Sequence, residues 1–276
     1  IEIEIVAWGE DKRSWSVDYR VLDGDTAQPD VWQKLDRLLA EDWPHERGGS
    51  LPIRVLCIDS GYATQEVYSW VRNHPQAVWC GAGARASQPR TVVAIKGRDT
   101  DTSLILSVSK ADTGGKRRGL RVWNVSGPVA KTELYRWLKL PRLTDEERER
   151  GEIEAPGSCH FPEYGEQYFK QLTAERRVIR IHKGFPRATW EKDPTRNNEA
   201  LDCRVYARAA ASIYGLDRFT DRQWNKMREA IKSLPVEQDE QITVPTTHPA
   251  VEAPQPSKTK PIFKQRATAV ADDPYL

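Results

Sequence analysis

The segment Asn197-Asn198-Glu199-Ala200-Leu201-Asp202-Cys203 opens the most apolar helical pattern in the chain. The pattern continues to Tyr214 and places four residues at i, i+4, i+7 and i+11 on one face: Asp202, Tyr206, Ala209 and Ile213. Asn198 is the expected N-cap, and Arg204 and Arg208 are expected on a face that reaches water. A carboxylate in an apolar stripe is costly unless it is paired or metal-bound. An acid in the exposed first turn of a helix is common, so position alone leaves both interpretations of Asp202 open.

The composition is compatible with one large domain or two small ones in 276 residues. Although the net charge is only +2, the chain contains two basic segments. Residues 170–228 hold fourteen Lys/Arg against seven Asp/Glu, and residues 81–121 hold nine against three. Either segment could contact phosphates, although a solvated basic surface has the same composition. The four scattered cysteines have no zinc or redox spacing and indicate free thiols in a reducing compartment. No stretch has the apolar length needed to span a bilayer, and no signal peptide is expected.

The first half of the chain predicts an α/β pattern. Alternating residues at 1–8 and 15–21 indicate a β-hairpin, and a helix is expected from Pro29 to about Trp43. The run LPIRVLCID (residues 51–59) predicts a central strand buried on both faces. Asp59 then lies at the carboxyl end of that strand, where open α/β sheets bind ligands. A turn-forming Asp before glycine is the alternative.

The rest of the chain predicts further helices, strands and an unstructured end. Helices are expected at residues 64–74, 128–140, 164–176 and 221–234, and strands at 91–96, 103–110, 120–125 and 178–182. Residues 112–119 form a basic hairpin tip that lacks the Gly and Ser/Thr spacing of a phosphate-binding loop. Residues 146–154 predict a charged connection and residues 184–196 a basic loop. His74 and His160 are expected to be structural. We expect one domain over residues 1–234 and a disordered tail over 235–276.

Several segments together resemble the C-terminal nuclease part of the lambda-type (GpA) large terminase subunits, the DNA-packaging motors of tailed bacteriophages. They cover residues 1 to about 214 in family order. The segments are Val6-Ala7-Trp8-Gly9 with Ser14-Trp15, Cys57-Ile58-Asp59-Ser60-Gly61 with Val67-Tyr68, Ala94-Ile95-Lys96-Gly97, Gly157-Ser158-Cys159-His160-Phe161-Pro162, Leu172-Thr173-Ala174-Glu175, and residues 196–203 with Tyr206-Ala207.

The resemblance implies an RNase H-like fold, in which helices flank a mixed β-sheet and a cluster of acids holds divalent metal. It maps two of the three family acids onto Asp59 and Asp202. The third acid is expected on a first strand before Ile1, so the chain is expected to be truncated at its N-terminus. The family's ATPase domain, and any use of ATP, would also lie upstream. The implied function is a metal-dependent endonuclease that cuts concatemeric double-stranded DNA while the genome is packaged into the procapsid.

The chemistry of that reaction assigns roles to particular residues. Hydrolysis of a phosphodiester needs an activated water and a stabilised leaving oxygen, which two metal ions about 4 Å apart can provide. Mg²⁺ and Mn²⁺ prefer carboxylate oxygens, so Asp59 and Asp202 are the expected catalytic ligands, with Glu199 as a further ligand or a helix-start residue. The residues expected to hold DNA phosphates are Lys96, Lys116, Arg117, Arg118 and Arg196. With two of three acids, the chain alone is expected to bind metal weakly and to cleave little.

Two other functions remain compatible with the sequence. Another RNase H-like nuclease, such as an integrase or resolvase, would need a third acid downstream at a suitable spacing. A non-catalytic DNA-binding adaptor module would keep the fold without the chemistry. The resemblance implies double-stranded DNA, the small terminase subunit and the portal as partners. It also implies that no membrane is involved and that the protein acts in the host cytoplasm.

Overall fold

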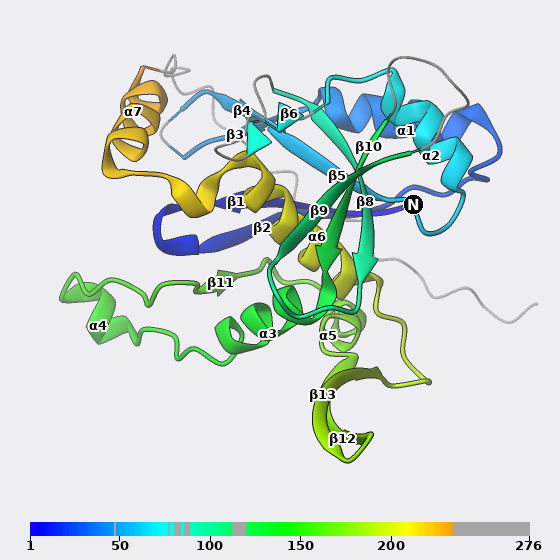
Figure 1. Ribbon diagram of the computed structural model, residues 1–276. Coiled ribbons are helices and arrows are strands. Elements are labelled where there is room, and N and C mark those ends of the chain that lie inside the picture. The colour runs from blue at the N-terminus through cyan, green and yellow to red at the C-terminus, as the bar shows by residue number, and fades with distance from the viewer. Residues whose placement is uncertain (47, 77, 80–83, 86–88, 112–119, 234–276) are drawn as a thin grey trace, which may run out of the picture. The chain divides into compact units, whose positions relative to one another are not determined.

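The computed structural model describes residues 1–46, 48–76, 78–79, 84–85, 89–111 and 120–233 (Figure 1). Its strands are β1 (Glu2–Trp8), β2 (Ser14–Val21), β3 (Asp42–Pro44), β4 (Ser50–Pro52), β5 (Val55–Asp59), β6 (Val78–Trp79), β7 (Ala84–Arg85), β8 (Thr91–Arg98), β9 (Ile105–Lys110), β10 (Arg121–Ser126), β11 (Cys159–His160), β12 (Glu175–His182) and β13 (Phe185–Lys192). Its helices are α1 (Pro29–Ala40), α2 (Thr64–Arg72), α3 (Gly127–Trp137), α4 (Asp145–Glu149), α5 (Glu166–Leu172), α6 (Glu199–Tyr214) and α7 (Asp221–Lys232), with 3₁₀ turns at Glu10–Lys12 and Leu216–Arg218.

Two sheets form most of the β structure. The N-terminal hairpin pairs β1 with β2 antiparallel, and β11 joins β2 in parallel, giving the order β1-β2-β11. The second sheet has the order β5-β8-β10-β9, in which the first three strands are parallel and β9 is antiparallel. The chain is therefore a mixed α/β structure, as the sequence predicted.

The apolar run at residues 51–59 folds differently from the prediction. It splits into β4 and β5, and β5 pairs only with β8 among the described strands, so it is an edge strand rather than a central one. The run is apolar because both faces of β5 are nevertheless covered. Leu56 and Ile58 pack on one hydrophobic cluster, whereas Val55 and Cys57 pack on another.

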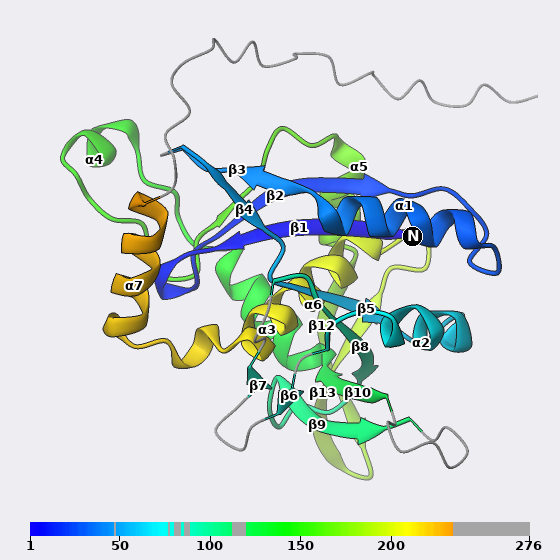
Figure 2. The same cartoon turned by 90° about the horizontal axis from the view of Figure 1, so that it is seen from above.

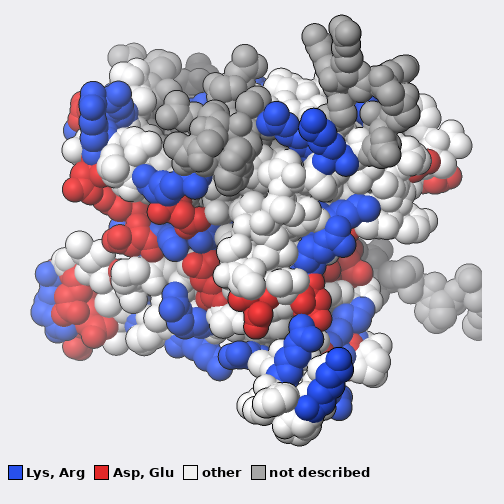
Figure 3. Space-filling model, in the orientation of Figure 1, with Lys and Arg blue, Asp and Glu red and all other residues white. Residues whose placement is uncertain are grey.

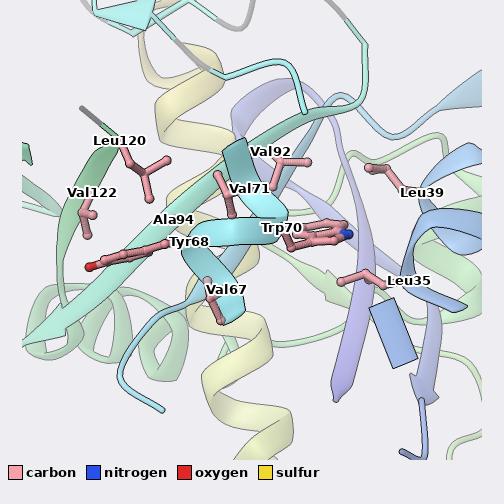
Figure 4. Close-up of a cluster of buried hydrophobic side chains, with 10 residues drawn as sticks. All are labelled: Leu35, Leu39, Val67, Tyr68, Trp70, Val71, Val92, Ala94, Leu120 and Val122. Carbon is pink, nitrogen blue, oxygen red and sulfur yellow. The ribbon is translucent and has the colours of Figure 1, made fainter. Parts of the chain in front are cut away.

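The four-stranded sheet is covered by helices on its two faces. On one face, residues of α1 and α2 pack with Val92, Ala94 and Val122 (Figure 4). On the other face, Val93, Ile95 and Trp123 pack against Ala209 and Ile213 of α6. Alternate residues of β8 and β10 thus point to opposite clusters, which is the period of two expected for strands.

Helix α6 is the element that joins these parts (Figures 1 and 2). It packs against β1 of the first sheet, β5 of the second, and helices α3 and α5. The predicted stripe is confirmed at Ala209 and Ile213, which are buried. The prediction that Arg204 and Arg208 reach water is wrong, because they are only 1% and 4% exposed. Packing on several sides leaves this helix little free surface, and both guanidinium groups pair with buried or half-buried acids.

Two connections hold regular structure that the sequence did not predict. The charged connection at 146–154 contains α4, which begins with a capping box between Thr144 and Glu147. Residues 184–196, predicted as a basic loop, contain strand β13 paired along its whole length with β12. The predicted basic tip at 112–119 and the predicted tail at 235–276 lie outside the described residues. Both therefore stay predictions, as does the domain boundary at residue 234.

His74 and His160, which the sequence predicted to be structural, both contact neighbouring residues of the fold. His74 bonds to the Trp70 carbonyl and to Asp36. His160 pairs with Glu154 and stacks on Trp15. No helix within the described part of the chain is both long and apolar enough to cross a membrane.

Candidate functional site

Asp59 ends strand β5 and is exposed at that edge of the sheet. Partial burial of the carboxyl group raises its pKa, although the N–H groups of Gly61 and Ser60 and the charge of Lys96 act in the opposite direction. Gly61 lies so close that a Cβ there would be 3.0 Å from Asp59 Oδ2. A side chain at position 61 would therefore displace the Asp59 carboxylate by a few tenths of an ångström.

Asp202 lies in the first turn of α6 and is partly buried. Burial first, and then the negative charges of Glu175, Asp59 and Glu199, raise the pKa of Asp202 to about 6 against the opposing charge of Lys131. Asp59 also acts on Tyr206, one turn along α6, whose pKa is raised first by burial and then by Asp59 and Asp202. The two predicted acids therefore lie close enough to influence each other from different elements.

Asn198 occupies the N-cap position of α6, but its side chain makes no capping hydrogen bond. Its Nδ2 donates instead to Asp202 Oδ2 at 3.1 Å and to Glu175 Oε1 at 3.0 Å. The Ala200 N–H at the start of the helix donates to the side chain of Gln171. Gln171 rather than Asn198 therefore accepts a hydrogen bond from the N-terminal turn of α6, and Asn198 links the carboxylates of Glu175 and Asp202.

Glu175 begins β12 and is buried, with 7% of its surface exposed. Lys131 of α3 donates from Nζ to both of its carboxylate oxygens, at 2.7 and 2.8 Å. Asn198 provides the link from this pair to Asp202. The site therefore contains a further acid and a lysine that sequence reasoning did not assign to it. Glu175 appeared there only as the last residue of a family segment, and its burial depends on Lys131, which lies 44 residues away in the sequence.

The remaining predicted residues divide into three groups. Glu199 lies one turn before Asp202 and acts on its pKa, and its buried Oε2 has no hydrogen-bond partner among the described residues. Lys96 ends the apolar part of β8 and acts on Asp59, so the structure brings it to the site. Arg196 is exposed in the loop before α6 and pairs with Asp193. Lys116, Arg117 and Arg118 fall outside the described residues.

The donor set suits a hard divalent cation. Three carboxylates, Glu175, Asp59 and Glu199, act on Asp202, while Lys131 acts on Asp202 and Lys96 acts on Asp59 in the opposite direction. The unneutralised negative charge that raises the pKa of Asp202 is what a bound cation would offset. However, no group of three His, Cys, Asp or Glu side chains in the described ranges converges closely enough to hold one ion. The residues therefore fit a metal in their chemistry, but the described side chains do not form a closed set of ligands.

Comparison with known proteins adds an independent observation. The family described as the endonuclease domain of the terminase large subunit gpA matches residues 1–224. The chain belongs to this family. The match includes every element that carries an acid of the site, from β5 to α6.

Two curated proteins show the same relationship. The chain is 24% identical over 216 residues to the terminase large subunit of Escherichia phage lambda, covering 77% of this chain and 30% of that protein. It is 24% identical over 212 residues to the terminase large subunit of Enterobacteria phage P21, with the same shares. The chain thus spans about 30% of the length of these relatives. No solved structure gives a significant match.

Proposed function

We propose that this chain forms the metal-dependent endonuclease centre of a phage terminase large subunit. In the whole protein this centre would cut concatemeric double-stranded DNA during packaging into the procapsid. The observation that carries the proposal is that Asp59, at the end of β5, lies close enough to Asp202, on α6, for its charge to raise the pKa of Asp202. Membership of the endonuclease-domain family supports it.

The proposed roles follow from the placement of each group. Asp59 and Asp202 would hold Mg²⁺ or Mn²⁺, with Glu199 as a further ligand beside them. Bound divalent ions supply an activated water and neutralise charge on the leaving oxygen. Lys131 holds Glu175 by an ion pair, and Asn198 fixes the orientation of Asp202 by a hydrogen bond. Lys96 and Arg196 are proposed to contact DNA phosphates, together with Lys116, Arg117 and Arg118.

The wider context is proposed on the same basis. An RNase H-like arrangement is supported by the mixed sheet, the acid at a strand end and the second acid on a late helix. The partners would be double-stranded DNA, the small terminase subunit and the portal, in the host cytoplasm. Glu175 is also a downstream acid of the kind that another RNase H-like nuclease would need, but its ion pair with Lys131 favours a supporting role.

The direct test is a calorimetric titration of Mn²⁺ into the chain and its variants. We expect the wild type to bind and Asp202→Asn and Asp59→Asn to lose most of the heat. Asp145→Asn, an exposed change on α4, is the matched control and should bind like the wild type. Equal binding by wild type and Asp202→Asn would remove Asp202 from the metal site. No binding by any of the proteins would favour a DNA-binding module without catalysis.

A further inference from the structure

The β12–β13 ribbon (Glu175–Lys192) is a two-stranded antiparallel hairpin that extends from the rest of the described chain (Figure 1). Its pairing runs without interruption from Glu175–Lys192 to His182–Phe185. Lys183 and Gly184 form the turn, both with positive φ, at 50° and 82°. Two successive positive φ angles are the signature of the tight hairpin turn that suits the twist of a ribbon. The ribbon is thus a regular element and not an irregular loop.

The outer part of the ribbon carries only positive charge. Residues 176–190 contain five Lys/Arg and no Asp or Glu. These are Arg176, Arg177, Arg180, Lys183 and Arg187, and all five are exposed. Arg180 pairs with Glu191 near the base, whereas Arg177, Lys183 and Arg187 have no acidic partner among the described residues. Figure 3 shows blue side chains gathered on the ribbon at the lower edge of the molecule, with acidic side chains directly above them in this view.

The same segment exposes large apolar side chains. Ile179, Ile181 and Phe185 are 74%, 72% and 74% exposed. Cross-strand partners share a face, so Ile179 and Ile181 lie with Ala188 and Pro186 on one face of the ribbon. On a free surface such a patch is unfavourable. The ribbon therefore has the composition of a binding element that combines positive charge with apolar contact.

The base of the ribbon is fixed beside the candidate site. Trp190 packs on Tyr135, and the Tyr135 hydroxyl donates to the Glu175 carbonyl at 2.5 Å. The Glu175 side chain bonds to Lys131 and to Asn198, which also bonds to Asp202. A ligand held along the ribbon is consequently delivered to the acids at its base.

We propose that the β12–β13 ribbon lies in the major groove of duplex DNA and positions the duplex at the Asp59–Asp202 site. The inference rests on the proposed function, because it takes the substrate class from it. A major groove admits a two-stranded β-ribbon. The exposed Lys and Arg side chains contact the phosphates on the two sides of the groove, and Ile179 and Ile181, which share one face of the ribbon, contact base edges such as the thymine methyl group.

The dimensions and the charge favour DNA over a protein partner. Seven residue steps from Glu175 to His182 span about 23 Å at roughly 3.3 Å per residue. That length corresponds to about seven base pairs at a rise of about 3.4 Å. Protein interfaces avoid lysine at their centres, whereas here Lys183 is at the tip next to Phe185. A phosphate backbone accounts for both the positive charge and the lack of acids.

The test measures binding of the full chain to a labelled duplex of roughly 30 base pairs, about three helical turns, in EDTA so that no cleavage occurs. The ribbon variant combines Arg177→Gln, Lys183→Asn and Arg187→Gln, where Asn is chosen because it tolerates the left-handed turn. We expect its affinity to fall roughly 30-fold and its salt slope to fall by about 2 to 3, since three phosphate contacts are lost. Ile181→Ser should weaken binding severalfold with an unchanged slope, because it removes an apolar contact to the bases and no phosphate contact.

The control variant carries Arg142→Gln, Arg148→Gln and Arg150→Gln, the same change in charge at exposed positions around α4. It should bind DNA with the slope of the wild type. A ribbon variant that binds like the wild type would overturn the ribbon proposal. So would a wild type that does not bind the duplex but binds Mn²⁺ through Asp202, and in both cases the metal-centre proposal would survive. If the ribbon variant binds DNA like the wild type but differs from it in self-association in ultracentrifugation, the ribbon would be assigned to a protein contact instead.

Discussion

At the scale of single residues, Arg204 and Glu4 form the most enclosed ion pair described in the chain. The two side chains are 1% and 0% exposed and are joined at 2.9 Å, and Arg204 also donates to Ser14. Its guanidinium lies over the ring of Phe161, 5.0 Å from the centroid. The pair joins α6 to β1, so it fixes the helix that carries Asp202 against the first sheet.

Breaking this pair should be more harmful than removing it. We expect Arg204→Met to lower the free energy of unfolding by about 3 to 5 kcal/mol, because it leaves the Glu4 carboxylate buried and uncompensated. The double variant Glu4→Leu/Arg204→Met should recover much of that loss, since it buries no charge. Urea unfolding of both variants measures the difference. If the double variant is no more stable than the single one, the uncompensated Glu4 charge is not the cause of the lost stability.

Asp217 provides a pH-dependent contribution to stability. Burial alone would raise its pKa, but the hydrogen bonds and charge of Arg208, with Ser212 and Lys12, outweigh burial and lower it. A lowered pKa in the folded state means that the contribution is present above the pKa of the unfolded state and is lost as the pH falls through the folded pKa. We expect Asp217→Asn to destabilise the chain by about 1 to 2 kcal/mol near neutral pH. The difference from wild type should shrink in unfolding experiments at acid pH, and a constant difference would contradict the assignment.

At the scale of elements, the β12–β13 ribbon depends on its turn. Gly184 has φ +82° and no atom within 4 Å of an added Cβ, so only backbone strain opposes a side chain there. We expect Gly184→Val to destabilise the ribbon by about 1 to 2 kcal/mol, whereas Gly184→Asn should cost much less because Asn tolerates this conformation. Hydrogen exchange of the amides in residues 176–190 should accelerate in the valine variant only. Equal exchange in both variants would mean that the turn does not limit opening of the ribbon.

The elements differ in how far the sequence could predict them. The sequence predicts helix α1 because a helix with one buried side has the full 3.6 period, and the structure buries the residues of that side, Val31, Leu35, Leu38 and Leu39. The ribbon was half missed because neither strand has a buried face to impose alternation, and a Lys-Gly turn is a weak signal. The burial of Arg204 and Arg208 was missed for a different reason. Pattern alone cannot show that distant acids, Glu4 and Glu133, neutralise arginines inside the structure.

At the scale of the whole molecule, the candidate site joins elements that are far apart in the sequence. Asp59, Lys131, Glu175 and Asp202 come from β5, α3, β12 and α6. The family resemblance pointed to Asp59 and Asp202 because each lies in a motif. The roles of Glu175, Lys131 and Asn198 could be identified only from the folded structure, because they depend on the hydrogen bonds that these residues make to one another. A ligand that binds these residues together must therefore stabilise the fold as a unit.

That reasoning gives a prediction for thermal stability. A ligand that binds only the folded state adds about 2.7 kcal/mol at a concentration of 100 times its Kd, which corresponds to a rise in Tm of about 5 to 10 °C for a chain of this size. We expect Mn²⁺ to produce such a rise in the wild type and in the exposed control Asp145→Asn, but not in Asp202→Asn. Without metal the order of the two Tm values should reverse. Asp202→Asn should melt above the wild type, because it removes a partly buried charge that Glu175, Asp59 and Glu199 all repel. An Asp202→Asn variant that is less stable without metal, and that Mn²⁺ stabilises as much as the wild type, would mean that the carboxylate serves the fold rather than an ion.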